Sequence, residues 1–224
     1  MIHAVKGKKH LFPVIAHNPH RMPGADGLAR ASDAPRSRTR HRRQFSNCED
    51  ADGCEAMTTA AMVGAGLIGR SWAMVFARAG WRVRLYDSIA SQLDAAREHI
   101  DSGLAEQQRY GLADDAAAAS ARVDYVADLE QALADVDWVQ ENAPEVLDVK
   151  RELYPPIDRA TPKTAIIASS TSAIPASRFT ESLAGRARCL VAHPVNPPHL
   201  VPVVELCGAP CRRDHRTADC DSRR

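Results

Sequence analysis

The chain has 224 residues and a formal net charge of +1, so no overall electrostatic field favours nucleic acid or a membrane surface as a partner. Its apolar fraction of 45% suits a globular domain, and no apolar run is long enough to cross a bilayer. The six cysteines lack C-x-x-C spacing, which argues against a disulfide framework and favours a reducing, cytoplasmic compartment.

Residues 1–56 keep no helical or strand period and hold five of the nine histidines and the run RSRTRHRRQ. We expect a disordered basic extension, because such a segment buries too little apolar area to offset its ordering entropy. Three origins of this segment stay open: translation starts at Met57 and the given start site is too early, the segment is a transit peptide rich in arginine, or it is an arm that binds nucleic acid. A secretory signal is disfavoured because no apolar core follows the lysines.

Residues 57–210 alternate strand-like and helix-like segments, which predicts one domain. Ser88 is a candidate cap for a helix with an apolar face, and Pro155 and Pro156 should end or kink a helix that starts near residue 146. The expected strands are 59–63, 81–87, 123–128, 136–143, 164–171, 189–195 and 200–207, and the expected helices begin at 67, 89, 129 and 146. This order predicts an α/β, Rossmann-type doubly wound fold, with a mostly parallel sheet and helices on both faces.

A glycine-rich turn joins the first strand to the first helix. Gly64, Gly66 and Gly69 have G-x-G-x-x-G spacing, and Asp87 follows 18 residues after the last of them, at the end of the next strand. These glycines permit a tight turn, a close approach of the backbone to a pyrophosphate, and close packing of helix on strand. Asp87 would bind the adenine ribose hydroxyls and repel a 2′-phosphate, so the predicted cofactor is NAD rather than NADP.

The helix that opens after this turn would offer free N–H groups and its positive dipole end to the phosphates. We therefore include Leu67 and Ile68, its first two residues, among the cofactor-binding residues.

Four stretches carry a resemblance to a known family: VGAGLIGRSWAMVFA, VQENAPEVLDVK, ASSTSAIPAS and VAHPVNPPHLVPVVEL. Over residues 59 to 210 the chain resembles the 3-hydroxyacyl-CoA dehydrogenase superfamily, and within it the lambda-crystallin or L-gulonate 3-dehydrogenase branch. The resemblance implies oxidation of the 3-hydroxyl of a 3-hydroxy acid or 3-hydroxyacyl-CoA by hydride transfer to NAD, an activity of fatty acid metabolism. Within this resemblance, the stretch HPVNPP favours small free 3-hydroxy acids such as L-gulonate as substrates. Family members that act on carnitine-like or CoA-linked substrates share most of the same motif.

The resemblance also implies roles for individual residues. His193 matches the general base, Glu205 the acid that hydrogen-bonds the imidazole, and Ser172 the serine that touches the substrate oxygen. The remaining matches are cofactor contacts, namely Glu145, Lys150 and Asn196, the last near the nicotinamide.

Chemistry supports the His193–Glu205 pair independently. A secondary alcohol needs a proton acceptor that is neutral near pH 7, and a free imidazole titrates at about 6.5. A carboxylate on the other ring nitrogen stabilises the imidazolium. An antiparallel hairpin through the turn NPPH would bring the two side chains face to face. Without the resemblance, the residues favour an ordinary hydrogen-bonded histidine at a strand end and a solvated acid on an edge strand. His199 is a weaker candidate base that we expect at the turn surface.

The family continues into a helical domain that closes the cleft and forms most of the homodimer contact, and this sequence does not match it. We expect residues 211–224 to be an unstructured tail and the chain to be truncated, so the alternative is an NAD-binding module with little activity. Expected partners are a small-molecule substrate and neither nucleic acid nor membrane. No metal is predicted, although Cys207, Cys211, His215 and Cys220 could form a small zinc site.

Overall fold

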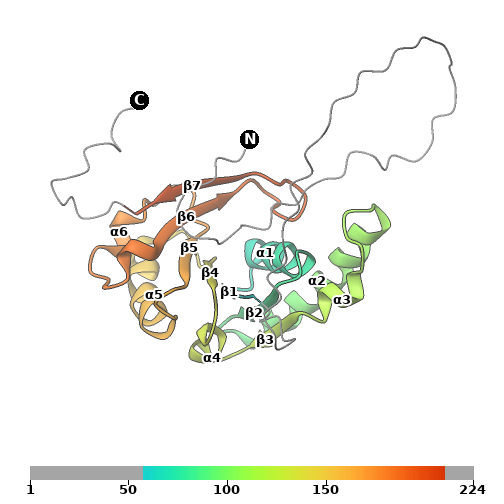
Figure 1. Cartoon of the computed structure of the whole chain (residues 1–224), viewed down its shortest axis with the longest axis horizontal. Coiled ribbons are helices and arrows are strands. Elements are labelled where there is room, and N and C mark those ends of the chain that lie inside the picture. Colours follow the sequence, from blue (N-terminus) through green and yellow to red (C-terminus); the bar gives the residue numbers. More distant parts are fainter. Residues whose placement is uncertain (1–57, 210–224) are drawn as a thin grey trace, which may run out of the picture. The chain divides into compact units, whose positions relative to one another are not determined.

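The computed structural model describes residues 58–209, which build one seven-stranded sheet (Figure 1). The expected extension, 1–56, and the expected tail, 211–224, lie outside the described residues. The strands are β1 (Thr59–Val63), β2 (Arg82–Tyr86), β3 (Val123–Val126), β4 (Trp138–Glu141), β5 (Ile166–Ser169), β6 (Cys189–Pro194) and β7 (Val204–Gly208). Their spatial order is β3-β2-β1-β4-β5-β6-β7.

All neighbouring strands in this sheet are parallel except β6 and β7, which are antiparallel. Strand β1 lies near the middle and is buried along its whole length, as expected for a parallel strand covered on both faces. The sheet runs outwards from β1 in both directions, which makes the β1–β4 boundary its topological switch point. The predicted Rossmann-type architecture is confirmed.

The helices form two packed groups. Helices α1 (Leu67–Arg78), α2 (Ala90–Arg109) and α3 (Ala116–Ser120) contact one another, and α4 (Leu129–Leu133), α5 (Leu147–Ala160) and α6 (Ser177–Thr180) form the other group. The alternation of side chains along β4 explains the division. Trp138 packs its ring near Phe76 of α1, with ring centroids 6.2 Å apart, whereas Val139 belongs to the core beneath α4 and α5.

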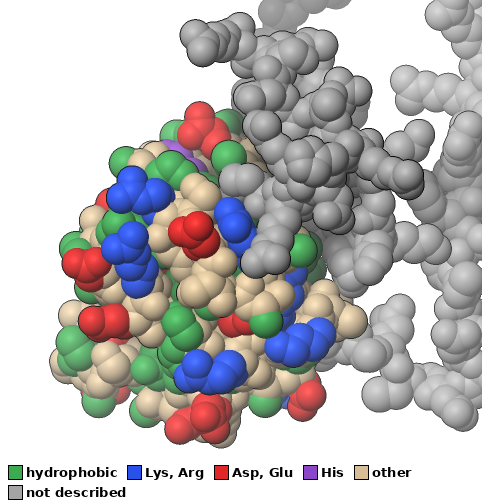
Figure 2. All heavy atoms as spheres, turned by 90° about the vertical axis from the view of Figure 1, so that its left-hand side faces the viewer, with side chains coloured by type: hydrophobic (Ala, Val, Ile, Leu, Met, Phe, Trp, Pro, Cys, Tyr) green, Lys and Arg blue, Asp and Glu red, His purple; other side chains and the backbone are tan. Residues whose placement is uncertain are grey.

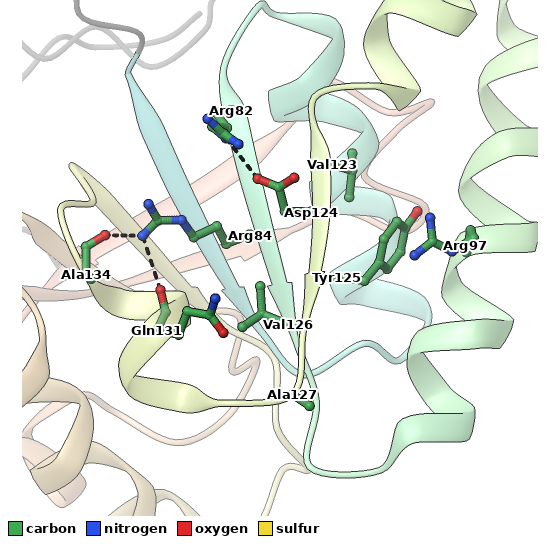
Figure 3. A pocket seen from close by; sticks show the side chains of 10 residues that line it. All are labelled: Arg82, Arg84, Arg97, Val123, Asp124, Tyr125, Val126, Ala127, Gln131 and Ala134. Carbon is green, nitrogen blue, oxygen red and sulfur yellow. Dashed lines mark hydrogen bonds and ion pairs between the residues drawn. The ribbon is translucent and has the colours of Figure 1, made fainter.

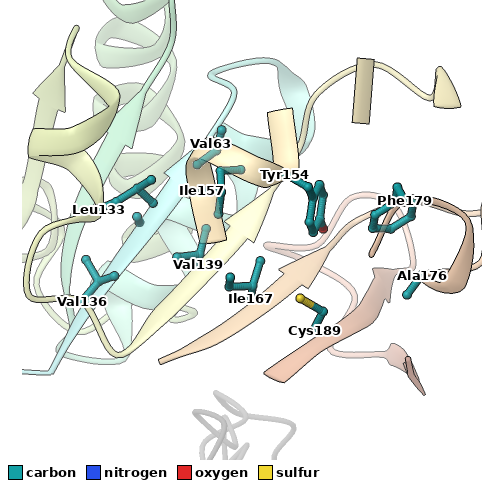
Figure 4. Packing of buried hydrophobic residues seen from close by; sticks show 11 residues of the cluster. Val63, Leu133, Val136, Val139, Tyr154, Ile157, Ile167, Ala176, Phe179 and Cys189 are labelled. Carbon is teal, nitrogen blue, oxygen red and sulfur yellow. The ribbon is translucent and has the colours of Figure 1, made fainter. Parts of the chain in front are cut away.

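The core on the α4–α5 side is a cluster of aliphatic and aromatic side chains (Figure 4). Tyr154 of α5 and Phe179 of α6 bring their ring centroids to 4.5 Å, and Ile157 and Ile167 are fully buried beside them. This packing holds α5 to the sheet and to α6 at once.

Helix α5 continues through Pro155 and Pro156 to Ala160, so the prediction that these prolines end the helix is wrong. The residues after the prolines are fixed by tertiary contacts. Asp158 accepts hydrogen bonds from Arg188 at 2.7 Å and from the Gly185 N–H at 3.0 Å. Burial raises the pKa of Asp158, but these hydrogen bonds and the charge of Arg188 outweigh it and hold the pKa below its ordinary value.

The structure also differs from the predictions at smaller elements. Ser88 does not cap α2; the N-cap position is Ile89, whose N–H donates to Asp87 Oδ1 at 3.0 Å. Its apolar face is as predicted, with Leu93, Ala96, Ile100 and Leu104 buried. Helices α3 and α6 and the short 3₁₀ helix at residues 186–188 were not predicted, because segments of three to five residues carry too little periodicity.

A cavity of about 600 Å³ lies at the β3 edge (Figure 3). Arg84 donates to the backbone carbonyls of Gln131 and Ala134, and Arg97 covers the Tyr125 ring at 4.0 Å from its centroid. Burial raises the pKa of Tyr125 to about 12. The cavity contains none of the predicted site residues, so we do not take it as the nucleotide site.

The surface in Figure 2 carries arginine and lysine side chains interspersed with acidic ones. Within residues 58–209, no helix is both long and apolar enough to span a membrane.

Candidate functional site

The predicted site residues gather at the carboxyl edge of the parallel sheet. The glycine-rich turn follows β1, Asp87 follows β2, Glu145 follows β4, Ser172 follows β5, and His193 lies near the end of β6. The last pair of the β5–β6 ladder is Ser169 with Val191. His193 lies two residues after Val191, so it extends past the end of β5. Ligands of doubly wound sheets bind at this edge, beside the switch point.

The three glycines of the turn meet different constraints. Gly64 has φ of +102°, and a Cβ there would lie 3.0 Å from the Asn142 carbonyl oxygen of the β4 end. A Cβ on Gly69 would lie 1.9 Å from the Gly64 carbonyl oxygen, so helix and turn pack too closely for a side chain. A Cβ on Gly66 would meet nothing within 4 Å. The open side of the turn is therefore at Gly66.

Helix α1 presents an uncapped N-terminus at this open side. Gly66 occupies the N-cap position in an extended conformation, no side chain caps the helix, and the first turn holds no acidic residue. Leu67, its first residue, is 69% exposed and Ile68 is partly buried. Backbone N–H groups that no side chain satisfies fit the phosphate oxygens of a dinucleotide.

Asp87 is held against the turn by both carboxylate oxygens. Oδ2 accepts the Ala65 N–H at 2.8 Å, and Oδ1 accepts the Ile89 N–H at 3.0 Å. Each oxygen keeps a lone pair, so the carboxylate can still accept from a ribose hydroxyl. Asp87 thus also holds the turn in place, a role that the sequence does not indicate because this bond joins residues 22 positions apart.

Glu145 fixes the loop that carries Ser172. Its Oε1 accepts from Thr171 Oγ1 at 2.6 Å, from the Ala173 N–H at 2.8 Å and from the Ser172 N–H at 3.1 Å. Burial raises the pKa of Glu145, but these hydrogen bonds and the charge of Lys150 outweigh it and hold the pKa below its ordinary value. The carboxylate therefore stays ionised and keeps the Ser172 backbone in place.

Lys150, predicted to contact the cofactor, lies in the core. Its side chain is 1% exposed, and Nζ donates to both carboxylate oxygens of Glu141 at 2.8 Å. Ser169 Oγ donates to the same carboxylate at 2.5 Å, and the Ala143 N–H donates to it at 2.7 Å. The buried Glu141 carboxylate at the end of β4 would be costly without an opposite charge, and the Lys150 ammonium supplies that charge from inside the core.

His193 and Glu205 form a close pair on the β6–β7 hairpin. They are direct partners in the antiparallel register, and His193 Nδ1 lies 3.0 Å from Glu205 Oε2. The predicted face-to-face hairpin is confirmed. An ionised carboxylate can only accept, so Nδ1 carries the hydrogen, and in the neutral imidazole Nε2 then keeps a lone pair. The imidazole is 31% exposed and the carboxylate 76% exposed.

The connection between β6 and β7 places the other two candidates differently. Asn196 is exposed, next to a cis Asn196–Pro197 peptide. His199, expected at the turn surface, is half-buried instead, and its Nδ1 lies 3.0 Å from Ser71 Oγ of α1. Burial, with the nearby charges of His99 and Arg78, lowers the pKa of His199.

A polar network beneath the site was not predicted. The Ser170 hydroxyl lies 2.7 Å from both Gln140 Nε2 and Asn142 Oδ1, and it accepts from Trp72 Nε1 at 3.1 Å. Gln140 is fully buried in β4. Two adjacent polar residues, Gln140 and Glu141, inside an apolar strand were the available signal, because buried polar side chains need partners.

Metal-ligating side chains form no cluster of three within the part of the chain that the structure describes. Cys207 is exposed on β7, while Cys211, His215 and Cys220 of the zinc alternative lie outside the described residues.

Comparison with known proteins agrees with this geometry. Residues 59–219 match the family described as 3-hydroxyacyl-CoA dehydrogenase, NAD binding domain. An L-carnitine dehydrogenase from Streptomyces coelicolor is 40% identical over 69% of this chain and 48% of its own length. Lambda-crystallin from Oryctolagus cuniculus is 38% identical over 66% of this chain and 48% of its own length.

Solved structures show the same fold. The 3-hydroxybutyryl-CoA dehydrogenase from Escherichia coli superposes with a TM-score of 0.63 at 29% identity, covering 67% of this chain and 32% of that one. A diketoreductase gives 0.62 at 30% identity, covering 67% of this chain and 54% of that one. The chain spans about half the length of the curated relatives it matches. The chain therefore belongs to the 3-hydroxyacyl-CoA dehydrogenase family and carries its NAD-binding domain.

Proposed function

We propose that this chain is the cofactor-binding part of an NAD-dependent oxidoreductase that oxidises the 3-hydroxyl of a 3-hydroxy acid or 3-hydroxyacyl-CoA. The observation that carries the proposal is the His193–Glu205 pair, with 3.0 Å between Nδ1 and Oε2, at the same sheet edge as an open glycine-rich turn. A nucleotide seated on that turn must extend past β4 and β5 to reach the imidazole on β6.

The residues that would hold the dinucleotide lie on the first two strand ends. Gly64 and Gly69 shape the turn, while the N–H groups of Gly66, Leu67 and Ile68 would bind the pyrophosphate. Asp87 would accept the adenine ribose hydroxyls, which favours NAD over NADP. When bound, NAD supplies the hydride acceptor.

His193 would remove the hydroxyl proton of the substrate at Nε2. Its Nδ1 hydrogen is committed to Glu205, and that bond sets the tautomer that leaves Nε2 able to accept. When the proton arrives, the imidazolium is stabilised by the carboxylate 3.0 Å away. The antiparallel register holds both groups on adjacent strands, so little reorganisation accompanies the transfer.

Ser172 would bind the substrate oxygen with its hydroxyl while Glu145 holds its backbone. Asn196, exposed in the β6–β7 connection, would lie near the nicotinamide. Glu145 would contact the cofactor on the same side, and Lys150 would support that contact from within the core, through its charge on Glu145 and its pair with Glu141.

For the substrate we favour a small free 3-hydroxy acid. The relative that supports this choice is an L-carnitine dehydrogenase, whose named substrate is itself a 3-hydroxy acid. CoA-linked substrates are the alternative, because a 3-hydroxybutyryl-CoA dehydrogenase shares the fold.

Calorimetry with NAD followed by a turnover assay tests the proposal. NADH formation from L-gulonate, L-carnitine and 3-hydroxybutyryl-CoA would be measured for the wild type, His193→Asn and Glu205→Gln. Both variants should bind NAD like the wild type, and His193→Asn should lose about 10²–10⁴-fold in turnover. His199→Asn is the matched control and should retain turnover. Wild-type binding without turnover on any of the three substrates would favour an NAD-binding module, and absence of NAD binding would refute both readings.

The proposal extends to assembly and location. The family resemblance supports a homodimer of the whole protein and a place in fatty acid metabolism. A cytoplasmic location is supported by the two described cysteines, Cys189 and Cys207, which are both free thiols. Sedimentation of the purified protein and cell fractionation test these two points.

A further inference from the structure

Arg70 of α1 makes contacts that the predicted site does not use. It follows Gly69 directly and is half-buried. Its Nε donates to the Ala65 carbonyl oxygen at 2.8 Å, and its Nη2 donates to Gln92 Oε1 in the first turn of α2 at 3.1 Å. One guanidinium thus bridges the glycine-rich turn and the helix that follows Asp87.

Together with Asp87, this contact fixes two consecutive peptide planes of the turn. The Ala65 N–H, in the Gly64–Ala65 peptide, donates to Asp87 Oδ2 at 2.8 Å. The Ala65 carbonyl, in the Ala65–Gly66 peptide, accepts from Arg70. Because a trans peptide is planar, fixing its carbonyl also fixes the opposite N–H, here that of Gly66.

The fixed Gly66 N–H is the group that the nucleotide would need. Gly66 has no side chain, and a Cβ there would meet nothing within 4 Å, so a ligand can approach the backbone on this side of the turn. Without Arg70 the peptide could rotate and turn its N–H away. A preorganised donor costs no reordering when the ligand binds.

We infer that Arg70 is a positioning residue for the cofactor, which aims the Gly66 N–H at the pyrophosphate by holding the Ala65–Gly66 peptide. The inference rests on the proposed NAD site. Its planar guanidinium makes two hydrogen bonds in different directions, to the turn and to Gln92, which a lysine ammonium on a flexible stem does not reproduce. A lysine at position 70 would keep the positive charge but not the directions of the two hydrogen bonds.

Calorimetric titration with NAD and with ADP-ribose would compare the wild type, Arg70→Ala, Arg70→Lys and Gln92→Ala. Both Arg70 variants should weaken both ligands about tenfold or more, and Gln92→Ala should weaken them less, since one of two bonds remains. Arg97→Ala is the matched control, because Arg97 is an exposed arginine of α2 that stacks on Tyr125, outside the site. It should bind both ligands like the wild type.

A spectroscopic readout separates positioning from general stability. In amide NMR spectra of the free proteins, the Gly66 resonance should shift or broaden in Arg70→Ala and stay unchanged in Arg97→Ala. Wild-type affinity in Arg70→Ala, or full rescue by lysine, would overturn the inference while leaving the NAD site intact. If neither Arg70 variant folds, unchanged affinity in Gln92→Ala overturns it. A wild type that binds no NAD instead refutes the proposed function itself.

Discussion

Two glycines of one motif should respond in opposite ways to the same added methyl group. In Gly69→Ala the new Cβ would lie 1.9 Å from the Gly64 carbonyl oxygen, whereas real Cβ contacts essentially never fall below 3.0 Å. The helix and the turn must therefore separate by about 1 Å or more. The neighbour is backbone at the centre of the sheet and has no rotamer to change, so we expect the upper end of the overpacking range, about 3 kcal/mol.

For a domain of this size each kcal/mol lowers Tm by about 2–4 °C, so Gly69→Ala should melt about 6–12 °C below the wild type. Gly66→Ala adds the same methyl where nothing lies within 4 Å and where φ is −68°, a value that alanine adopts readily. Its Tm should equal that of the wild type or rise slightly, because alanine has fewer unfolded conformations to lose. Its NAD affinity should fall by about tenfold or more, since the methyl occupies the space through which the pyrophosphate approaches the backbone.

Thermal unfolding followed by circular dichroism and calorimetric titration with NAD give both quantities for each variant. A Tm of Gly69→Ala within a degree of the wild type would show that helix α1 does not approach the turn so closely. Wild-type NAD affinity in Gly66→Ala would show that the pyrophosphate does not lie on this turn, and the nucleotide site would have to be sought elsewhere on the sheet edge.

Three further predictions concern buried charge, acid stability and thiols. Glu141→Gln leaves the buried Lys150 ammonium without its counter-charge and should lower the free energy of unfolding, measured by urea titration, by about 3–5 kcal/mol. The double variant Glu141→Gln/Lys150→Met should recover part of this loss. A loss below about 1 kcal/mol in the single variant would contradict the buried pair. The folded-state pKa of Asp158 is lowered, so the ionised carboxylate stabilises the fold above about pH 4, and this stabilisation is lost as pH falls through the folded pKa. The difference in unfolding free energy between the wild type and Asp158→Asn should therefore shrink in acid. A difference that stays constant with pH would contradict the lowered pKa. Burial raises the pKa of Cys189 to about 11, so at pH 8 a thiol reagent should label the exposed Cys207 and spare Cys189 until the protein is unfolded.

Local patterns determined most of the fold. The apolar run of β1, the G-x-G-x-x-G spacing and the acid at the end of β2 are properties of contiguous segments, and each lies in the structure where the sequence places it. The hairpin that pairs His193 with Glu205 is similarly local, because its two strands follow each other directly in the chain and are joined by the connection 195–203, which contains Pro197 and Pro198.

Tertiary structure decided the features that depend on partners distant in sequence. Helix α5 runs through Pro155 because Ile157 is buried in the core and Asp158 is bonded to Arg188 and Gly185, and those contacts outweigh the local cost of proline. The side chain of Lys150 points into the core and pairs with the buried Glu141, a contact that the motif alone does not indicate.

The same reason applies to the turn itself. The spacing of its glycines was readable from the sequence, but the Arg70 and Asp87 hydrogen bonds that hold its peptides join segments brought together only by the folded sheet. Hydrophobic period and turn chemistry are local and appear in the sequence, whereas the pairing of buried charges and backbone groups depends on which strand ends meet at one edge.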